Sequence, residues 1–229
     1  MKFFKLITVL LSTTLLMVSC GNNGDYSSTK QGALSGNAAE RVYVAPGEHD
    51  EFYAFISGGF SGQLAVYGLP SGRLFKVIPV FSQDPEKAYG YNEETKPMLN
   101  TSHGFIPWDD SHHPDISQTA GELDGRYVFI NGNNTPRIAK IDLTTFETTE
   151  IIEIPNSAGN HSSSFVTENT EYVVAGTRFS VPVPQVDMPI KDYKGNFKGA
   201  LSFISVDPED GGMDIKFQIL MPGFNYDLS

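Results

Sequence analysis

The sequence predicts an all-β protein, and more narrowly a β-propeller. From Phe52 onward, apolar residues come in short runs separated by Gly, Pro, Asn and Asp, which is typical of strands and turns. No helical period is sustained across three turns. A phrase of three strands occurs twice, and its opening strand occurs a third time. A β-sandwich would also have short alternating strands, but it would not repeat this phrase, so the pattern favours the propeller.

Residues 1–20 are typical of an export signal. Lys2 and Lys5 precede the apolar run Leu6–Val18, which is too short to span a bilayer comfortably. The single cysteine, Cys20, follows in the sequence MVSC, which resembles a bacterial lipobox and makes Cys20 the candidate for lipidation. The alternative is a simple secretory signal that is cleaved nearby. Under either interpretation we expect an exported protein, with membrane contact only through a lipid on Cys20.

Residues 21–40 are polar and predict a flexible tether, and residues 41–229 predict a partial propeller domain. The expected strands of that domain are Phe52–Ser57, Gln63–Tyr67, Leu74–Phe81, Tyr127–Asn131, Arg137–Asp142, Thr148–Ile154, Tyr172–Thr177, Ala200–Val206 and Asp214–Met221.

The repeated phrase spans Tyr53–Val80 and again Tyr127–Pro155. Each copy has an aromatic-led strand, a Gly/Asn-rich turn, a second strand, another turn and a third strand. A third aromatic-led strand begins at Tyr172, 45 residues after Tyr127, and a propeller blade takes about 40–45 residues. The interval from Tyr53 to Tyr127 is longer, at 74 residues, which indicates an insertion between two blades.

That insertion, Gln83–Leu123, is rich in polar and turn residues and contains the adjacent His112 and His113. On a regular strand, neighbouring side chains point to opposite faces, so the two imidazoles could not share one site. We therefore expect them in a loop, where both rings can turn to a common metal and Pro114 stiffens the chain that follows. His161 lies in the loop that leaves the second copy of the phrase, and corresponding blade ends converge on the central channel of a propeller.

The neighbouring acidic residues have two interpretations. Asp110 and Asp115 either accept ring N–H groups and so orient the imidazoles, or they are solvated turn residues, which is the expectation for Asp109. The other polar and aromatic candidates are expected to be bystanders: His49 on the surface, His103 without an assigned role, and Trp108 in packing.

Composition excludes several functions. The chain has 27 acidic residues against 16 Lys+Arg, for a formal charge of −11, which argues against a nucleic-acid partner. One cysteine rules out thiolate metal cages, and no Gly-rich phosphate loop or nucleophile elbow occurs. An exported site of several imidazoles suits copper or zinc.

The segment DDSHHPDISQTAGELDGRYVFINGNNTPRIAKIDL (109–143) resembles the double-histidine segment of nitrous oxide reductase. The segment IIEIPNSAGNHSSSFVTENTEYVVAGTRFSVPVP (151–184) is also similar to this family, and the resemblance covers nearly all of the chain after Arg41. The export signal lacks paired arginines, which resembles the Sec-exported branch of the family.

The resemblance implies a seven-bladed propeller whose hub holds a tetranuclear copper–sulfide cluster bound by seven histidines. His112 and His113 match the adjacent cluster ligands and His161 matches the next one, with no catalytic residue beyond the ligands. It also implies a cupredoxin-type domain with a dinuclear copper site, calcium as a further candidate ion, and a periplasmic homodimer. This dimer would reduce nitrous oxide to dinitrogen and water, with electrons from a donor such as a c-type cytochrome.

This sequence has counterparts for about three blades and three of the seven histidines. We therefore interpret it as the N-terminal part of a longer reductase, inactive as an isolated fragment. The alternative is a non-catalytic exported propeller that serves as a binding module and has no use for clustered histidines.

Overall fold

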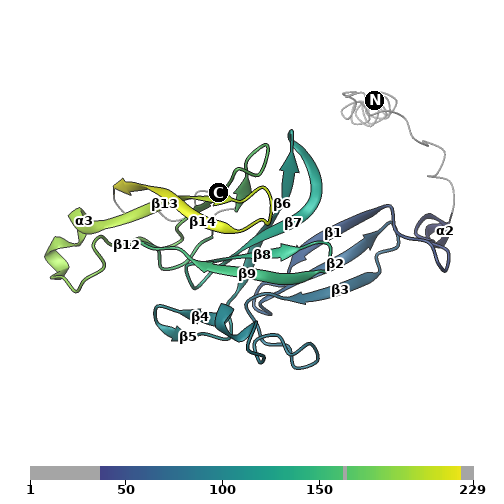
Figure 1. Ribbon diagram of the computed structural model, residues 1–229, viewed down its shortest axis with the longest axis horizontal. Coiled ribbons are helices and arrows are strands. Elements are labelled where there is room, and N and C mark those ends of the chain that lie inside the picture. The colour runs from purple at the N-terminus through teal and green to yellow at the C-terminus, as the bar shows by residue number, and fades with distance from the viewer. Residues whose placement is uncertain (1–36, 162–163, 223–229) are drawn as a thin grey trace, which may run out of the picture. The chain divides into compact units, whose positions relative to one another are not determined.

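The computed structural model describes residues 37–161 and 164–222 (Figure 1). By its internal contacts the chain divides into two units, residues 1–41 and 42–229. Of the first unit, the structure describes one short helix, α2 (Ala38–Arg41), and its preceding residue. The predicted export signal, Cys20 and most of the predicted tether lie outside the described residues and stay predictions.

The second unit is mostly β, with helices of only three or four residues among the described part. Its first sheet is the antiparallel meander β1 (Phe52–Ser57), β2 (Gln63–Leu69) and β3 (Leu74–Pro79). Its second sheet is the four-stranded meander β6 (Ser111–Thr119), β7 (Glu122–Gly132), β8 (Arg137–Asp142) and β9 (Glu147–Glu153).

The third sheet runs in the order β10 (Phe165–Val166), β11 (Tyr172–Gly176), β13 (Phe197–Val206) and β12 (Val181–Pro182), and β14 (Met213–Pro222) also pairs with β13. Between β12 and β13 lie η2 (Ile190–Asp192) and α3 (Tyr193–Asn196). The segment between β3 and β6 carries η1 (Lys96–Leu99) and the small hairpin β4 (Asn100–Thr101) and β5 (Gly104–Phe105).

The strands predicted from the repeated phrase are present. The two copies form β1-β2-β3 and β7-β8-β9, each an antiparallel meander, and their bounds differ from the predicted ones by a few residues. The expectation that Gln83–Leu123 is an irregular insertion was wrong, because it contains the nine-residue strand β6. The prediction of an all-β class is confirmed, and the described sheets do not close into a complete propeller (Figure 1).

The second sheet is buried on both faces, because neighbouring residues of a strand point to opposite sides. On β7, Val128 and Ile130 pack in a core with residues of β2 and β3, such as Val66 and Ile78. Phe129, between them, packs in a second core with Val173 and Ile204 of the third sheet. The second sheet therefore lies between the other two. Among the described residues, no helix has the length and apolar character needed to cross a membrane.

Candidate metal centre

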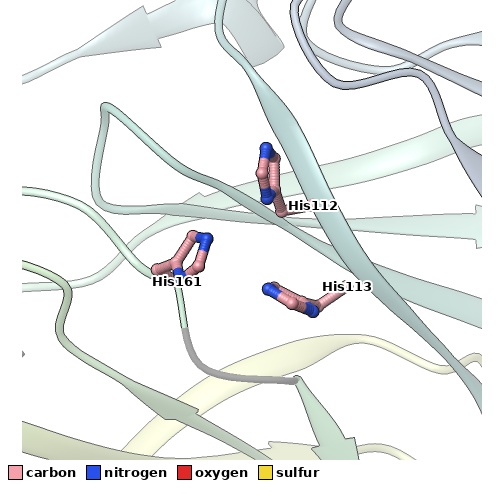
Figure 2. A group of neighbouring side chains, drawn as sticks. All are labelled: His112, His113 and His161. Carbon is pink, nitrogen blue, oxygen red and sulfur yellow. The ribbon is translucent and has the colours of Figure 1, made fainter. Parts of the chain in front are cut away.

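His112 and His113 lie at the start of β6, and a β-bulge brings both rings to one side. The pairing of β6 with β7 passes from His112 opposite Asn131 to Asp115 opposite Phe129. Two residues of β6, His113 and Pro114, therefore oppose one residue of β7. His113 takes a φ of +47°, in the left-handed region that non-glycine residues seldom adopt. The bulge cancels the strand's alternation, and Figure 2 shows both rings on the same side of the strand. The two rings lie close together, and they lie on a bulged strand rather than in the loop that the sequence predicted.

The third histidine, His161, comes from the loop after β9, and this loop is fastened to the end of β7. The amide of Asn160 donates to the Gly132 carbonyl at 3.1 Å, and the amide of Arg178 donates to the Gly159 carbonyl at 2.6 Å. A side chain at Gly159 would place its Cβ 2.5 Å from the Asn133 carbonyl oxygen, so only glycine permits this approach. The close contact of the loop with β7 carries His161 to the other two histidines.

The three rings form a compact group (Figure 2). Their centroids are 5.5 Å apart for His112 and His113, 5.0 Å for His112 and His161, and 4.8 Å for His113 and His161. One ring nitrogen from each lies within 4.8 Å of the others, and all three side chains are half-buried. Three nitrogens bound to one ion at about 2.1 Å and tetrahedral angles would be about 3.4 Å apart. The three ring nitrogens lie within about 1.4 Å of that spacing, and an all-imidazole donor set fits copper or zinc.

Asp110 is the carboxylate that reaches this group. It is buried, and its Oδ1 lies 3.0 Å from His112 Nε2. Its Oδ2 accepts a hydrogen bond of 3.1 Å from Asn133 Nδ2, and Oδ1 is buried without a hydrogen bond from the described residues. A carboxylate in this place favours a proton on Nε2 of His112, which leaves Nδ1 as the nitrogen with a lone pair for a metal.

Asp115 has a different position. Its Oδ2 accepts a hydrogen bond of 2.8 Å from the Val166 amide, and its Oδ1 accepts one of 2.9 Å from the Ile116 amide. The carboxylate thus ties β6 to β10, at the start of the third sheet.

Asp109 is fully buried, so the expectation that it is a solvated turn residue was wrong. Its carboxylate accepts hydrogen bonds from the amides of Asn134 and Thr135 at 2.9 and 3.0 Å and from the Thr135 hydroxyl. The guanidinium of Arg137, also fully buried, lies 3.8 Å away. Burial lowers the pKa of Arg137, and the nearby Asp109 opposes this change. Asp109 lies two residues before the first residue of β6, so these contacts anchor the start of β6 to the β7–β8 turn.

The remaining candidates lie apart from the group. His49 and His103 are exposed, and neither belongs to the three-histidine cluster. Trp108 is 43% exposed, stacks with Phe60 and donates from its indole nitrogen to the Phe60 carbonyl at 2.6 Å. Sequence reasoning missed Asn131, which is fully buried opposite His112. Its signal was an asparagine directly after the apolar run VFI, at the end of the expected strand Tyr127–Asn131.

Comparison with known proteins places this geometry in context. No family model matches the chain. The nitrous-oxide reductase of Pseudomonas fluorescens is 34% identical over 203 residues, which cover 87% of this chain and 31% of that protein. The nitrous-oxide reductase of Stutzerimonas stutzeri is 34% identical over 185 residues, covering 80% of this chain and 28% of that protein. The chain is a homologue of nitrous-oxide reductases. The resemblance predicted from its sequence is confirmed.

Other nitrous-oxide reductases agree with this result. The one from Cupriavidus necator is 34% identical over 216 residues, covering 90% of this chain and 32% of that protein. The chain therefore spans about a third of the length of the nitrous-oxide reductases that it matches.

Two solved structures overlap with this chain in part. A hydrazine synthase of Kuenenia stuttgartiensis overlaps with a TM-score of 0.38 at 13% identity, covering 71% of this chain and 50% of that one. The β-propeller domain of Cps50 (Swd1) from Myceliophteria thermophila overlaps with a TM-score of 0.34 at 10% identity, covering 72% of this chain and 54% of that one. Overlaps this low support no conclusion about the fold.

Proposed function

We propose that this chain is part of a nitrous-oxide reductase and supplies three imidazole ligands to its copper centre. One observation carries the proposal. Three histidines from two segments 48 residues apart place a nitrogen each within 4.8 Å of one another, in a homologue of these enzymes. Clustered imidazoles at a shared point are the donor set that copper takes in the absence of thiolates.

The ligand roles follow from the positions of the side chains. His112, His113 and His161 would hold copper as neutral imidazoles, and Asp110 would orient His112 by accepting a hydrogen bond from its Nε2–H group. The other four ligands of a tetranuclear copper–sulfide cluster would come from further residues of the complete reductase. Bound there, the cluster would supply the chemistry that reduces nitrous oxide by two electrons and two protons to dinitrogen and water.

The same proposal extends to the architecture. The three described sheets would be consecutive blades of a propeller, and the start of β6 would face its hub. The periplasm, the homodimer, a c-type cytochrome as electron donor, the cupredoxin-type domain and calcium are parts of this proposal that rest on the homology alone. Export and lipidation of Cys20 are likewise proposed.

The test replaces the histidines one at a time in the complete protein. His112→Ala, His113→Ala and His161→Ala should each prevent assembly of the cluster and abolish reduction of nitrous oxide, because each removes one metal ligand. Copper content, the absorbance of the purified protein and nitrous oxide consumption are the measurements. His103→Ala and His49→Ala are matched controls, since both side chains are exposed and outside the group, and both should behave like the wild type.

Full copper content and full turnover in the His112→Ala or His113→Ala variant would overturn the assignment. A protein that folds stably and takes up no copper in any variant, the wild type included, would instead support the non-catalytic binding module.

A further inference from the structure

Asn131 lies between the two chain segments that carry the three histidines. It is at the end of β7 and is the direct cross-strand partner of His112 on β6. Its side chain is fully buried, and its Nδ2 donates a hydrogen bond to the carbonyl oxygen of Asn160. Asn160 immediately precedes His161. The Asn131 carboxamide therefore contacts Asn160, the residue before His161, while the Asn131 backbone is paired with His112.

The second polar atom of Asn131 is an acceptor held in the interior. Its Oδ1 is buried, and no donor among the described residues reaches it. A buried acceptor left without a hydrogen bond costs about 1–3 kcal/mol. The residues before it on β7, Phe129 and Ile130, are apolar and fully buried, so this end of the strand lies in the hydrophobic interior. A leucine would fill the same shape without this cost, which indicates that the carboxamide serves something other than packing.

The Asn131 contact also works with the backbone bonds of the same loop. The Asn160 amide donates to the Gly132 carbonyl, so β7 holds residue 160 at both its N–H and its C=O. The Asn160 side chain adds contacts of its own, accepting from the Ser157 hydroxyl at 3.1 Å and donating to the Arg137 carbonyl at 3.5 Å. Of these bonds, the one from Asn131 acts on the carbonyl nearest to His161. Removing it takes away one of the contacts that hold the peptide plane leading directly into that residue, beside the β-bridge between Asn160 and Thr177.

We propose that Asn131 is a positioning residue that sets the distance of His161 from the His112–His113 bulge. This inference rests on the proposed function, since it assumes that the three imidazoles hold a metal together. Asn131 touches no metal in this role. It acts through the Asn160 carbonyl on one side and through its strand pairing with His112 on the other.

The test measures Cu(II) binding by the full chain, titrated with copper sulfate in a non-coordinating buffer. Asn131→Leu keeps the side-chain shape and removes both polar atoms. Loss of a group that orients a metal ligand should weaken copper binding about 10–100-fold. In a His161→Ala background, Asn131→Leu should change the affinity less than about twofold, because a residue that acts only through His161 has nothing left to position. The nitrogen splitting in the Cu(II) electron paramagnetic resonance spectrum should lose the contribution of one imidazole in Asn131→Leu, and the same loss is expected in His161→Ala.

Two further variants keep the result interpretable. Asn131→Asp retains an acceptor but turns the donor towards Asn160 into a second acceptor, so it should weaken copper binding as Asn131→Leu does. Asn134→Leu is the matched control, since Asn134 lies three residues along the chain with an exposed side chain, and it should bind copper like the wild type. Urea denaturation of each variant without copper shows whether it is folded.

The outcomes separate this inference from the proposed function. Equal copper affinity in the wild type and in His161→Ala would overturn the proposed function. Weak binding in His161→Ala, combined with wild-type affinity and an unchanged spectrum in folded Asn131→Leu and Asn131→Asp, would overturn the role of Asn131 alone. A loss of affinity from Asn131→Leu that is just as large in the His161→Ala background would also overturn it.

Discussion

Arg137 and Asp109 form a buried charged pair beside the candidate metal centre. Both side chains are almost fully enclosed. The guanidinium also donates from Nε to the Thr135 hydroxyl at 2.7 Å and from one Nη to the Ile106 carbonyl at 3.2 Å, and it lies over the ring of Phe81 at 5.1 Å. At the scale of single residues, this pair joins the segment before β6 to the first residue of β8. Asp110, which contacts His112, is the residue after Asp109.

Arg137→Met should destabilise the protein by about 3–5 kcal/mol, because it leaves the Asp109 carboxylate buried without its opposite charge. Urea denaturation, followed by tryptophan fluorescence and circular dichroism, gives the free energy of unfolding. Arg73→Met is the control. Arg73 pairs with Asp50 at 3.0 Å but its side chain is 54% exposed, so its loss should be far smaller. Equal losses in the two variants would show that the buried pair has no special contribution.

The residues of the candidate site were predictable to different degrees. His112, His113 and His161 stand out in the sequence because imidazoles are few and two are adjacent. Asp109 and Asn131 do not stand out, because aspartate and asparagine are common turn residues and only the three-dimensional packing buries them. Burial of a polar side chain depends on contacts with distant segments, here residues 134–137 and 160, and a local pattern does not carry that information.

At the scale of elements, β6 is the strand that the pattern concealed. Its sequence, SHHPDISQT, has no regular alternation of apolar and polar residues, and it contains a proline. The strand still pairs with β7 because the bulge at His113 and Pro114 absorbs the proline where no ladder bond is required. β6 thus has polar side chains where β1, β2 and β8 have the hydrophobic ones that reveal a strand.

The hairpin of β6 and β7 is closed by Asp124. Burial alone would raise the pKa of this carboxyl, but hydrogen bonds from the side chains of Arg126, Ser117 and Thr119 outweigh it and lower the pKa to about 2. Arg126 lies 2.8 Å from the carboxylate. The ionised carboxylate therefore joins both strands of the hairpin beyond the bulge.

The pH dependence of stability should show this contact. Because the folded-state pKa of Asp124 is below its ordinary value of 3.8, its contribution is complete above that value and is lost as the pH falls towards about 2. The difference in unfolding free energy between wild type and Asp124→Asn should therefore be constant from neutral pH to about pH 5 and shrink between about pH 4 and pH 2. Urea titrations at each pH measure it. A difference that does not change over this range would contradict the assigned contact.

At the scale of the whole molecule, the three sheets are joined by more than their two hydrophobic cores. The turn between β13 and β14 docks on the second sheet, where Lys140 donates to the Gly211 carbonyl at 2.8 Å. Glu150 accepts a hydrogen bond from the Met213 amide at 3.1 Å and lies 3.2 Å from the ammonium of Lys140. Lys140 also lies over the ring of Tyr127, at 5.3 Å. The second and third sheets are therefore fixed to each other by polar contacts at their edge.

Gly211→Ala should loosen this junction. Gly211 has a φ of +75°, and an added Cβ would lie 2.6 Å from the ring of Tyr127. The left-handed backbone costs an alanine about 1–2 kcal/mol, and the steric overlap adds about 1–3 kcal/mol. Gly72→Ala is the matched control, since Gly72 has a φ of +68° with open space around it and should lose only the backbone part. Thermal unfolding of the two variants measures the difference, and equal melting temperatures would show that the turn does not pack as described.

Much of the fold was predictable because its repeated phrase is local. Each copy is a run of neighbouring strands joined by short turns, so the strands and their antiparallel order follow from nearby residues. The way in which the sheets stack was not predictable from the same pattern. It depends on β7 presenting Val128 and Ile130 to one core and Phe129 to the other, and a continuous apolar run does not reveal how its two faces are shared.

Under the proposed function, the bulge that carries His112 and His113 would also affect when copper binds. One peptide bond joins these two histidines, so they stay neighbours in a newly made chain that has no tertiary structure. His161 lies 48 residues further along the chain than His113, so only folding brings it to the other two. A pair of imidazoles prefers copper to most competing divalent ions and imposes little geometry of its own. Copper that arrived before folding would therefore be held by only two of the three imidazoles, and the order of folding and metal delivery would determine the accuracy of loading.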